Sequence, residues 1–131
     1  MTDIRFDVLG IGNAIVDVLA HADDEFLNSH GLVKGTMSLI DEATAEAVYD
    51  KMGPAIECSG GSAANTIAGV ASLGSRGAFI GKVKDDQLGQ VFRHDITALG
   101  IAFETAADSA PDGASTARCM IHVTPDAQRT M

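Results

Sequence analysis

An 18-residue stretch without a charged side chain, Cys58–Ser75, constrains the fold of this chain more than any other feature. Its length would suffice to cross a membrane, but it carries four glycines and six Ser, Thr or Asn residues, whose transfer into lipid is unfavourable. The adjacent glycines Gly60 and Gly61 separate a strand from a helical pattern over 63–73, which Gly74 ends in the favoured C′ position. The stretch therefore predicts a strand, a loop and a helix of an α/β domain.

Hydrophobic periodicity predicts the other elements along the chain. The helices are expected over 42–52, capped by Asp41, and after a cap at Asp85 or Asp86, ending at Gly100. The strands are expected over 6–12, 14–20, 36–40, 78–83, 101–104 and 116–123. The strand–helix–strand order around 56–83 favours parallel pairing through a right-handed crossover. Because only a few residues follow the turn at Pro125-Asp126, we expect the chain to be part of a larger protein.

Composition excludes several classes of partner. Eighteen acidic and nine basic side chains give a net charge of −9, which repels phosphate backbones, so nucleic acid and anionic membranes are not expected as partners. The two cysteines, Cys58 and Cys119, form neither a disulfide framework nor a CxxC zinc motif. The acidic start of the chain does not match a targeting segment, so a cytoplasmic location is expected.

Two phosphate-binding motifs are incomplete. Gly81-Lys82 is followed by Val83 rather than Ser or Thr, and Arg76 stands where a Walker loop needs its first glycine. Gly10-Ile11-Gly12 begins a dinucleotide fingerprint, but Ile15 replaces its third glycine and a strand pattern follows in place of a helix. No metal site is expected at the scattered histidines His21, His30, His94 and His122.

Two polar groups remain as candidate ligand sites. Gly60 and Gly61 allow a ligand to approach the main chain at a helix N-terminus, where Asn65 in the first turn offers an amide to a hydroxyl. A plain loop capped by Ser62 explains the same residues equally well on spacing alone. Asn13 and Asp17 form a similar pair after the first strand, where α/β sheets bind ligands; a loop turn and a surface charge are the alternative.

Taken together, these segments resemble the N-terminal portion of a PfkB/ribokinase-family carbohydrate kinase, in its adenosine-kinase-like branch. VLGIGNAIVD (8–17) matches the family's G-N-x-x-x-D substrate motif, and GGSAANTIAGVASLG (60–74) matches the first family signature. AFIGKVKDDQLG (78–89) matches the continuation, and 116–131 resembles a lid strand and the start of its partner. Two residues depart from the pattern: Ile67 replaces a small residue, and Lys84 replaces a glycine.

The resemblance implies a ribokinase-like parallel sheet flanked by helices, with a small β-sheet lid, here truncated. Residues 1–13 and 41–115 would form the acceptor-binding half of the core, and 14–40 and 116–131 part of the lid. By the resemblance, Asn13 and Asp17 hydrogen-bond sugar hydroxyls, Gly61 and Asn65 hold the same sugar from the other side, and Ser62 is a weaker candidate. Gly60-Gly61 would be the hinge of lid closure. A homodimer formed through the lid is also implied.

The implied reaction transfers the γ-phosphate of ATP, with Mg²⁺, to a primary hydroxyl of a sugar or nucleoside such as adenosine or another ribose- or fructose-type acceptor. The family's catalytic Asp belongs to a GAGD motif that does not occur here, so no catalytic residue is assigned in this chain, and the ATP-binding region is also missing. Two alternatives stay open: a non-catalytic sugar-binding or interaction module, and a dinucleotide enzyme built on Gly10-Ile11-Gly12.

Overall fold

The computed structural model describes residues 3–131, which form two compact units. Unit 1 consists of the described residues up to Val16 together with Cys58–Arg118, and unit 2 consists of Asp17–Glu57 together with Cys119–Met131. Each unit is described by itself below. The residues 41–57, expected in the core, fall in unit 2, while the functional division into core and lid remains a prediction.

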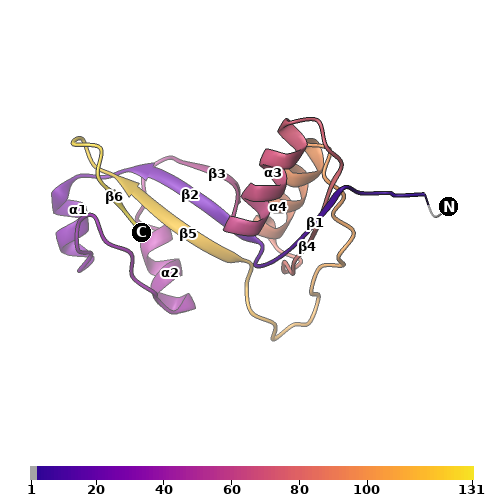
Figure 1. Cartoon of the computed structure of the whole chain (residues 1–131). Coiled ribbons are helices and arrows are strands. Elements are labelled where there is room, and N and C mark those ends of the chain that lie inside the picture. Colours follow the sequence, from indigo (N-terminus) through magenta and orange to yellow (C-terminus); the bar gives the residue numbers. More distant parts are fainter. Residues whose placement is uncertain (1–2) are drawn as a thin grey trace. The chain divides into compact units, whose positions relative to one another are not determined.

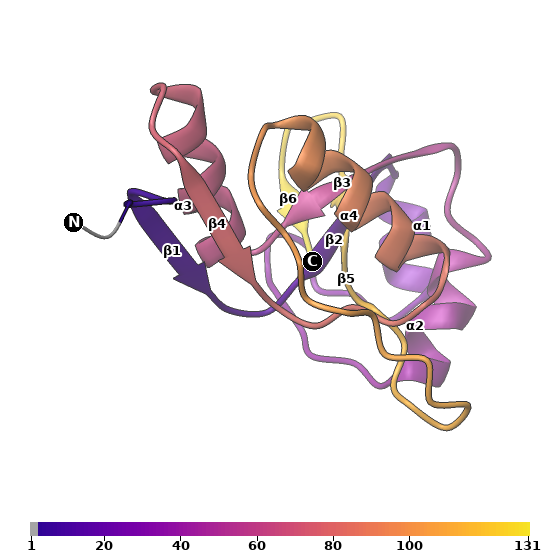
Figure 2. The same cartoon turned by 90° about the vertical axis from the view of Figure 1, so that its right-hand side faces the viewer.

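Unit 1 is built on a parallel pair of strands. Strand β1 (Val8–Ile11) pairs with β4 (Gly77–Ile80), with Val8 opposite Gly77 and Ile11 opposite Ile80. Helix α3 (Ser62–Ser72) packs against both strands (Figure 2). A single parallel bridge joins Ala102 to Ala78 of β4, and helix α4 (Gln87–Ala98) lies between them in the sequence. The predicted parallel α/β arrangement is therefore present.

Ile67 of α3 is the central contact between this helix and the strand pair. Its side chain is 1% exposed, and a Cβ atom at Gly10 or at Gly77 would lie 2.6 or 2.7 Å from it. The departure of Ile67 from the small residue of the family pattern is thus accommodated by two strand positions that carry no side chain. A cluster of the rings of Phe79, Phe92 and Phe103, with centroids 5.4–5.8 Å apart, completes the core.

Unit 2 contains most of a four-stranded sheet and two short helices (Figure 1). The strand order is β3 (Ala55–Gly60), β2 (Ile15–His21), β5 (Ala117–Val123) and β6 (Arg129–Thr130), and β5 and β6 are antiparallel. Burial alternates along β2 and β5, as period-two side-chain packing requires. The buried residues of this unit include Val18, Ala20, Met120 and His122 of the strands and Leu27, Ala45 and Val48 of helices α1 (Asp24–Ser29) and α2 (Glu42–Tyr49).

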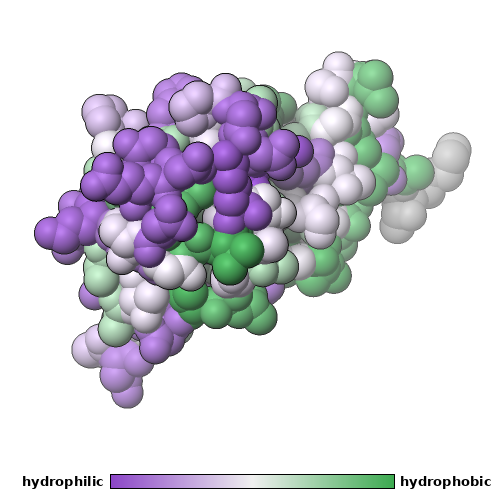
Figure 3. Space-filling model, turned by 90° about the vertical axis from the view of Figure 1, so that its left-hand side faces the viewer, coloured by the Kyte–Doolittle hydropathy of each residue, from purple (hydrophilic) through white to green (hydrophobic). Residues whose placement is uncertain are grey.

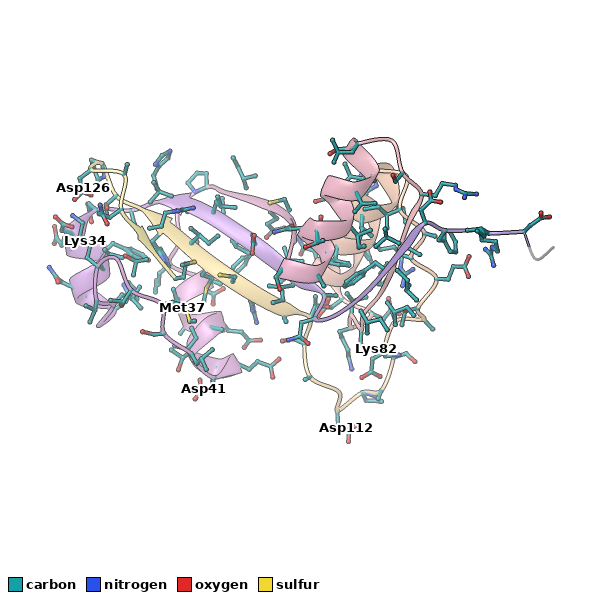
Figure 4. The ribbon with its side chains drawn as sticks, in the orientation of Figure 1. Lys34, Met37, Asp41, Lys82, Asp112 and Asp126 are labelled. Carbon is teal, nitrogen blue, oxygen red and sulfur yellow. The ribbon has the colours of Figure 1, made fainter. Side chains whose placement is uncertain are left out.

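One ion-pair cluster joins three segments of unit 2. The Lys34 ammonium lies 2.9 Å from Asp24 of α1 and 2.7 Å from Asp126 in the turn between β5 and β6 (Figure 4). Thr124 also donates its hydroxyl to Asp126, and these two partners lower the pKa of Asp126 to about 2. Nearby, the backbone of Thr36 and Ser38 bonds to Met131. The segment after α1 is therefore held by these bonds against the turn between β5 and β6 and the residue after β6.

Two predicted strands are absent and a third is shorter than predicted. Residues 36–40 form no strand, because their backbone bonds across the unit reach only Met131, beside a two-residue strand β6. Strand β4 ends at Ile80 instead of 83, because beyond it the backbone of Val83 and Asp85 bonds to Asp108. Residues 101–104 contribute only the bridge at Ala102.

The helix predictions are confirmed more closely. The carboxylates of Asp41 and Asp86 accept backbone N–H bonds from Thr44 at 2.8 Å and from Gly89 at 2.7 Å, as expected of N-caps. Gly74 ends α3 with a φ of 88°. Among residues 3–131, no helix is both long and apolar enough to cross a membrane.

Candidate functional site

Gly61 brings the N-terminus of helix α3 close to the loop between β1 and β2. It is the N-cap residue of α3, with a φ of 93°, a conformation that L side chains rarely adopt. A Cβ atom here would lie 2.9 Å from the carbonyl oxygen of Asn13, closer than real contacts allow. Gly61 is therefore required both by its own backbone and by the approach of Asn13.

Helix α3 begins without a side-chain cap. At the starts of α1, α2 and α4, the carboxylates of Asp23, Asp41 and Asp86 each accept a hydrogen bond from a backbone N–H of the first turn. In α3 no side chain takes this role, and Ser62, expected to cap in the plain-loop alternative, is instead the first helical residue. Since the first N–H groups of a helix lack partners within it, α3 presents free donors and the positive end of its dipole.

The polar residues of this segment lie at the surface of unit 1. Ser62 and Asn65, in the first turn of α3, are exposed, as is Asn13 in the loop before β2. Gly60, the last residue of β3, is buried. The structure thus places the carbonyl of Asn13 beside Gly61 at the first turn of α3, while the role of these residues in ligand binding stays a prediction.

Asp17 is a half-buried carboxylate within strand β2 of unit 2. Within residues 3–131 it has no hydrogen bond or ion pair, and burial raises its pKa. Cys119 of β5 is close enough for the charge of Asp17, together with burial, to raise the pKa of the thiol. A carboxylate that has lost part of its hydration without gaining a protein partner is well suited to accept hydrogen bonds from the hydroxyl groups of a ligand.

The network around Thr116 is a feature that the sequence did not reveal. Its hydroxyl, on a residue only 2% exposed, donates to Asp86 at 2.7 Å and accepts the N–H of Lys84 at 2.9 Å, while its own N–H donates to Asp86 at 2.9 Å. The only available signal was the cap at Asp86. This network fixes the start of β5 to the beginning of α4.

The structure removes the alternative of a dinucleotide enzyme. The residues after Gly10-Ile11-Gly12 enter strand β2, so the helix N-terminus required to bind a dinucleotide pyrophosphate is missing there. Among the described residues, no three His, Cys, Asp or Glu side chains are grouped to hold a metal ion.

Comparison with known proteins identifies the fold as ribokinase-like. A probable sugar kinase from Rhizobium etli CFN 42 superposes with a TM-score of 0.83 at 52% identity, over 97% of this chain and 38% of that one. An adenosine kinase from Sinorhizobium meliloti does so with a TM-score of 0.81 at 55% identity and the same coverage. Residues 36–131 match the sequence profile of the pfkB family carbohydrate kinases, and the chain belongs to that family.

The chain is also similar to a curated fructokinase. A fructokinase from Klebsiella pneumoniae is 36% identical over 64 residues, which are 49% of this chain and 21% of the fructokinase. The chain thus spans about two-fifths of the solved kinases and a fifth of this curated relative. The expected ribokinase-like class and family are confirmed.

Proposed function

We propose that this chain supplies acceptor-binding parts of an ATP-dependent kinase. The proposed kinase phosphorylates a primary hydroxyl of a nucleoside, with adenosine as the preferred acceptor. Membership of the pfkB family supports phosphoryl transfer, and 55% identity to an adenosine kinase supports a nucleoside acceptor. The observation that carries the proposal is the uncapped N-terminus of α3, which Gly61 brings to the carbonyl of Asn13.

In unit 1, the proposed role of these residues is to bind and orient acceptor hydroxyls. Gly61 exposes main chain where any side chain would intrude, and the first N–H groups of α3 can donate to an oxygen. The Asn65 amide can both donate to a hydroxyl and accept from one, as can that of Asn13. Ser62 is a weaker contributor of the same kind, and Gly60 would permit movement at the end of β3.

In unit 2, Asp17 is proposed to accept hydrogen bonds from acceptor hydroxyls. Such bonds would replace hydration that the carboxylate loses in β2, so binding relieves a cost that the free protein bears. Charge-assisted bonds also fix the orientation of the hydroxyl-bearing ring, which is how a kinase presents one hydroxyl to the phosphoryl group. The catalytic base and the groups that hold ATP and Mg²⁺ are not assigned to these residues, and no step is derived through them.

A chimera tests the proposal. These 131 residues replace the matching part of the Sinorhizobium meliloti adenosine kinase, which is 55% identical to them. The purified chimera is then assayed for ATP-dependent phosphorylation of adenosine, fructose and ribose. We expect activity on adenosine that exceeds activity on either free sugar.

The alternatives correspond to other results of that assay. Preference for fructose would favour the second acceptor class, which the similarity to a fructokinase suggests. A folded chimera that binds adenosine but does not phosphorylate it would instead support the non-catalytic binding module. A folded chimera with neither binding nor activity would overturn the acceptor-binding role.

A further inference from the structure

A buried histidine in unit 2 is not used by the proposed function. His122 of β5 is 2% exposed, and neither of its ring nitrogens has a hydrogen-bond partner of ordinary geometry. Buried polar groups are almost always paired, so an imidazole in this state is unusual. Its ring lies among the buried side chains of unit 2.

The ring lies beside helix α1, in a tilted contact with Phe26. Phe26 of α1 has its ring centroid 5.2 Å from that of His122, and the ring of His30 stacks on Phe26 at 4.3 Å. Helix α1 is six residues long, and Leu27 is its only buried residue. Because so short a helix is not stable alone, its position depends on these few side-chain contacts.

The surroundings of His122 favour a neutral ring. Burial lowers the pKa of His122, the nearby backbone of Thr130 opposes this only in part, and His30 adds to the lowering. The buried residues that β2 contributes to this unit, Val18 and Ala20, are uncharged. In β6 the buried Thr130 is uncharged, and the charged Arg129 is exposed. From α1 and the segment after it, Asp24 and Lys34 pair with each other, Lys34 also pairs with Asp126, and Glu25 is exposed.

We propose that His122 acts as a proton-sensitive latch, whose protonation releases α1 from the sheet of unit 2. An imidazolium has two N–H donors, and the backbone of Thr130 can accept at most one of them. The second donor and the charge would stay buried without a partner, so the charged form favours an opened unit in which water reaches the ring. The inference concerns unit 2 alone and does not depend on the kinase proposal.

The direction of the pH dependence follows from the lowered pKa. In the closed unit, where α1 packs on the sheet, the pKa of His122 lies below the ordinary histidine value of 6.5. In the opened unit, where water reaches the ring, the pKa returns to that ordinary value. The closed state is therefore fully favoured above pH 6.5. The closed state becomes less stable relative to the opened state as the pH falls below 6.5, and this loss stops once the pH is below the lowered pKa of His122.

Hydrogen–deuterium exchange of the 131-residue chain tests the latch. Amide exchange of residues 24–32 is measured at about pH 7.5 and about pH 5.5, after correction for the intrinsic pH dependence of exchange. We expect protection of these amides to fall by roughly tenfold at the lower pH. In His122→Phe, which keeps a ring but cannot be protonated, protection should be the same at both pH values, while the exposed control His21→Gln should behave like the parent.

A parent chain with equal protection at both pH values would overturn the proposal, as would a His122→Phe variant with the parent's response. A nuclear magnetic resonance titration of the His122 ring in the parent provides an independent test if the variant does not fold. Uptake of the proton together with loss of α1 protection supports the latch. Uptake with α1 still protected contradicts it.

Discussion

Gly61 and Gly69 lie in the same segment, but a side chain would meet steric hindrance only at Gly61. Gly61 has a φ of 93° and no room for a Cβ atom beside Asn13, whereas Gly69 lies inside α3 with open space around it. We expect Gly61→Ala to destabilise the chain by about 1–3 kcal/mol, because it adds backbone strain and a contact with a carbonyl oxygen. Chemical denaturation monitored by circular dichroism measures this change.

Gly69→Ala is the matched control for that experiment. It should stabilise the chain by about 0.5–1 kcal/mol, because alanine restricts the unfolded chain and favours the helix. Equal effects of the two substitutions would show that the position of Gly61 at the start of α3 has no special constraint.

The carboxylate of Asp17 should lower the stability of the chain and at the same time favour acceptor binding. Its pKa is raised by burial, so the charged form costs stability as the pH rises through that pKa, and the cost is fully present at neutral pH. We therefore expect Asp17→Asn to raise the Tm of the 131-residue chain at pH 7. In the chimera the same change should lower kcat/KM for the acceptor by ~10²-fold or more, because charge-assisted bonds to hydroxyls are lost.

The two readouts distinguish a binding residue from a structural one. Glu57→Gln, in β3 of the same unit, serves as a control because Tyr49 donates to this carboxylate. It should lower the Tm with little effect on acceptor kinetics. Unchanged acceptor kinetics in a folded Asp17→Asn chimera would remove Asp17 from the site.

The candidate residues could be chosen from the sequence, but their constraints could not. Two adjacent glycines before a helical pattern were enough to predict the loop at Gly61. The clash with Asn13 depends on how closely two loops approach in space, 48 positions apart in the chain, and no local pattern records that distance. The same limit applies to His122: the alternation over 116–123 groups Ala117, Cys119, Ile121 and Val123 on one face, whereas the residues that the structure buries are Met120 and His122 on the other.

At the scale of elements, Thr116 connects the start of β5 to the cap of α4. Thr116→Val keeps the shape of the side chain but removes a hydroxyl that bonds both Asp86 and the backbone of Lys84. We expect a loss of about 1–3 kcal/mol, because buried partners are left unpaired. Urea denaturation at pH 7 checks the size of the loss, and Thr116→Ser, which retains the hydroxyl, should recover much of it.

The same network gives an acid dependence of known sign. Burial by itself would raise the pKa of Asp86, but bonds from Thr116 and Gly89, with the charge of Arg118, outweigh it and lower the pKa below 3.8. Its contribution is therefore complete above pH 3.8 and is lost as the pH falls through the lowered value. In Thr116→Val this loss on acidification should be smaller than in the parent, and an identical acid profile would contradict the assignment.

The elements were predicted best where the signal is local. The caps at Asp41 and Asp86 and the stop at Gly74 depend on residues within one turn of the helix, and all three are confirmed. The errors concern pairing between distant segments. The strand expected at 36–40 depends on Met131, and the end of β4 depends on Asp108, so neither can be read from local periodicity.

At the scale of the whole molecule, strand β1 exposes apolar side chains. Leu9 and Ile11 are 54% and 70% exposed, and in the described part of the chain β1 pairs only with β4. Open strand edges with apolar residues promote association. In Figure 3, hydrophobic residues also reach the surface beside hydrophilic ones. We expect the 131-residue chain to associate as its concentration rises.

Sedimentation velocity over a concentration series measures this association. Ile11→Lys should reduce it, because a lysine on an exposed strand opposes edge pairing. Leu73→Lys, at an 87% exposed leucine after α3, is the matched control and should leave association unchanged. Equal effects of both changes would point to general hydrophobicity rather than to the edge of β1.

The final prediction concerns chemistry by the 131 residues alone. They cover 38% of the length of the solved adenosine kinase and sugar kinase that they resemble, and they contain no GAGD motif. Phosphoryl transfer needs a base for the hydroxyl proton, donors for the developing charge and a bound nucleotide. With a net charge of −9, the chain also repels ATP at long range. A radiolabelled-phosphate assay on the purified chain should therefore show no transfer to adenosine, ribose or fructose above background, while the chimera is active under the same conditions. Transfer that survives removal of every contaminating kinase would place a catalytic group among these residues and overturn their assignment to acceptor binding alone.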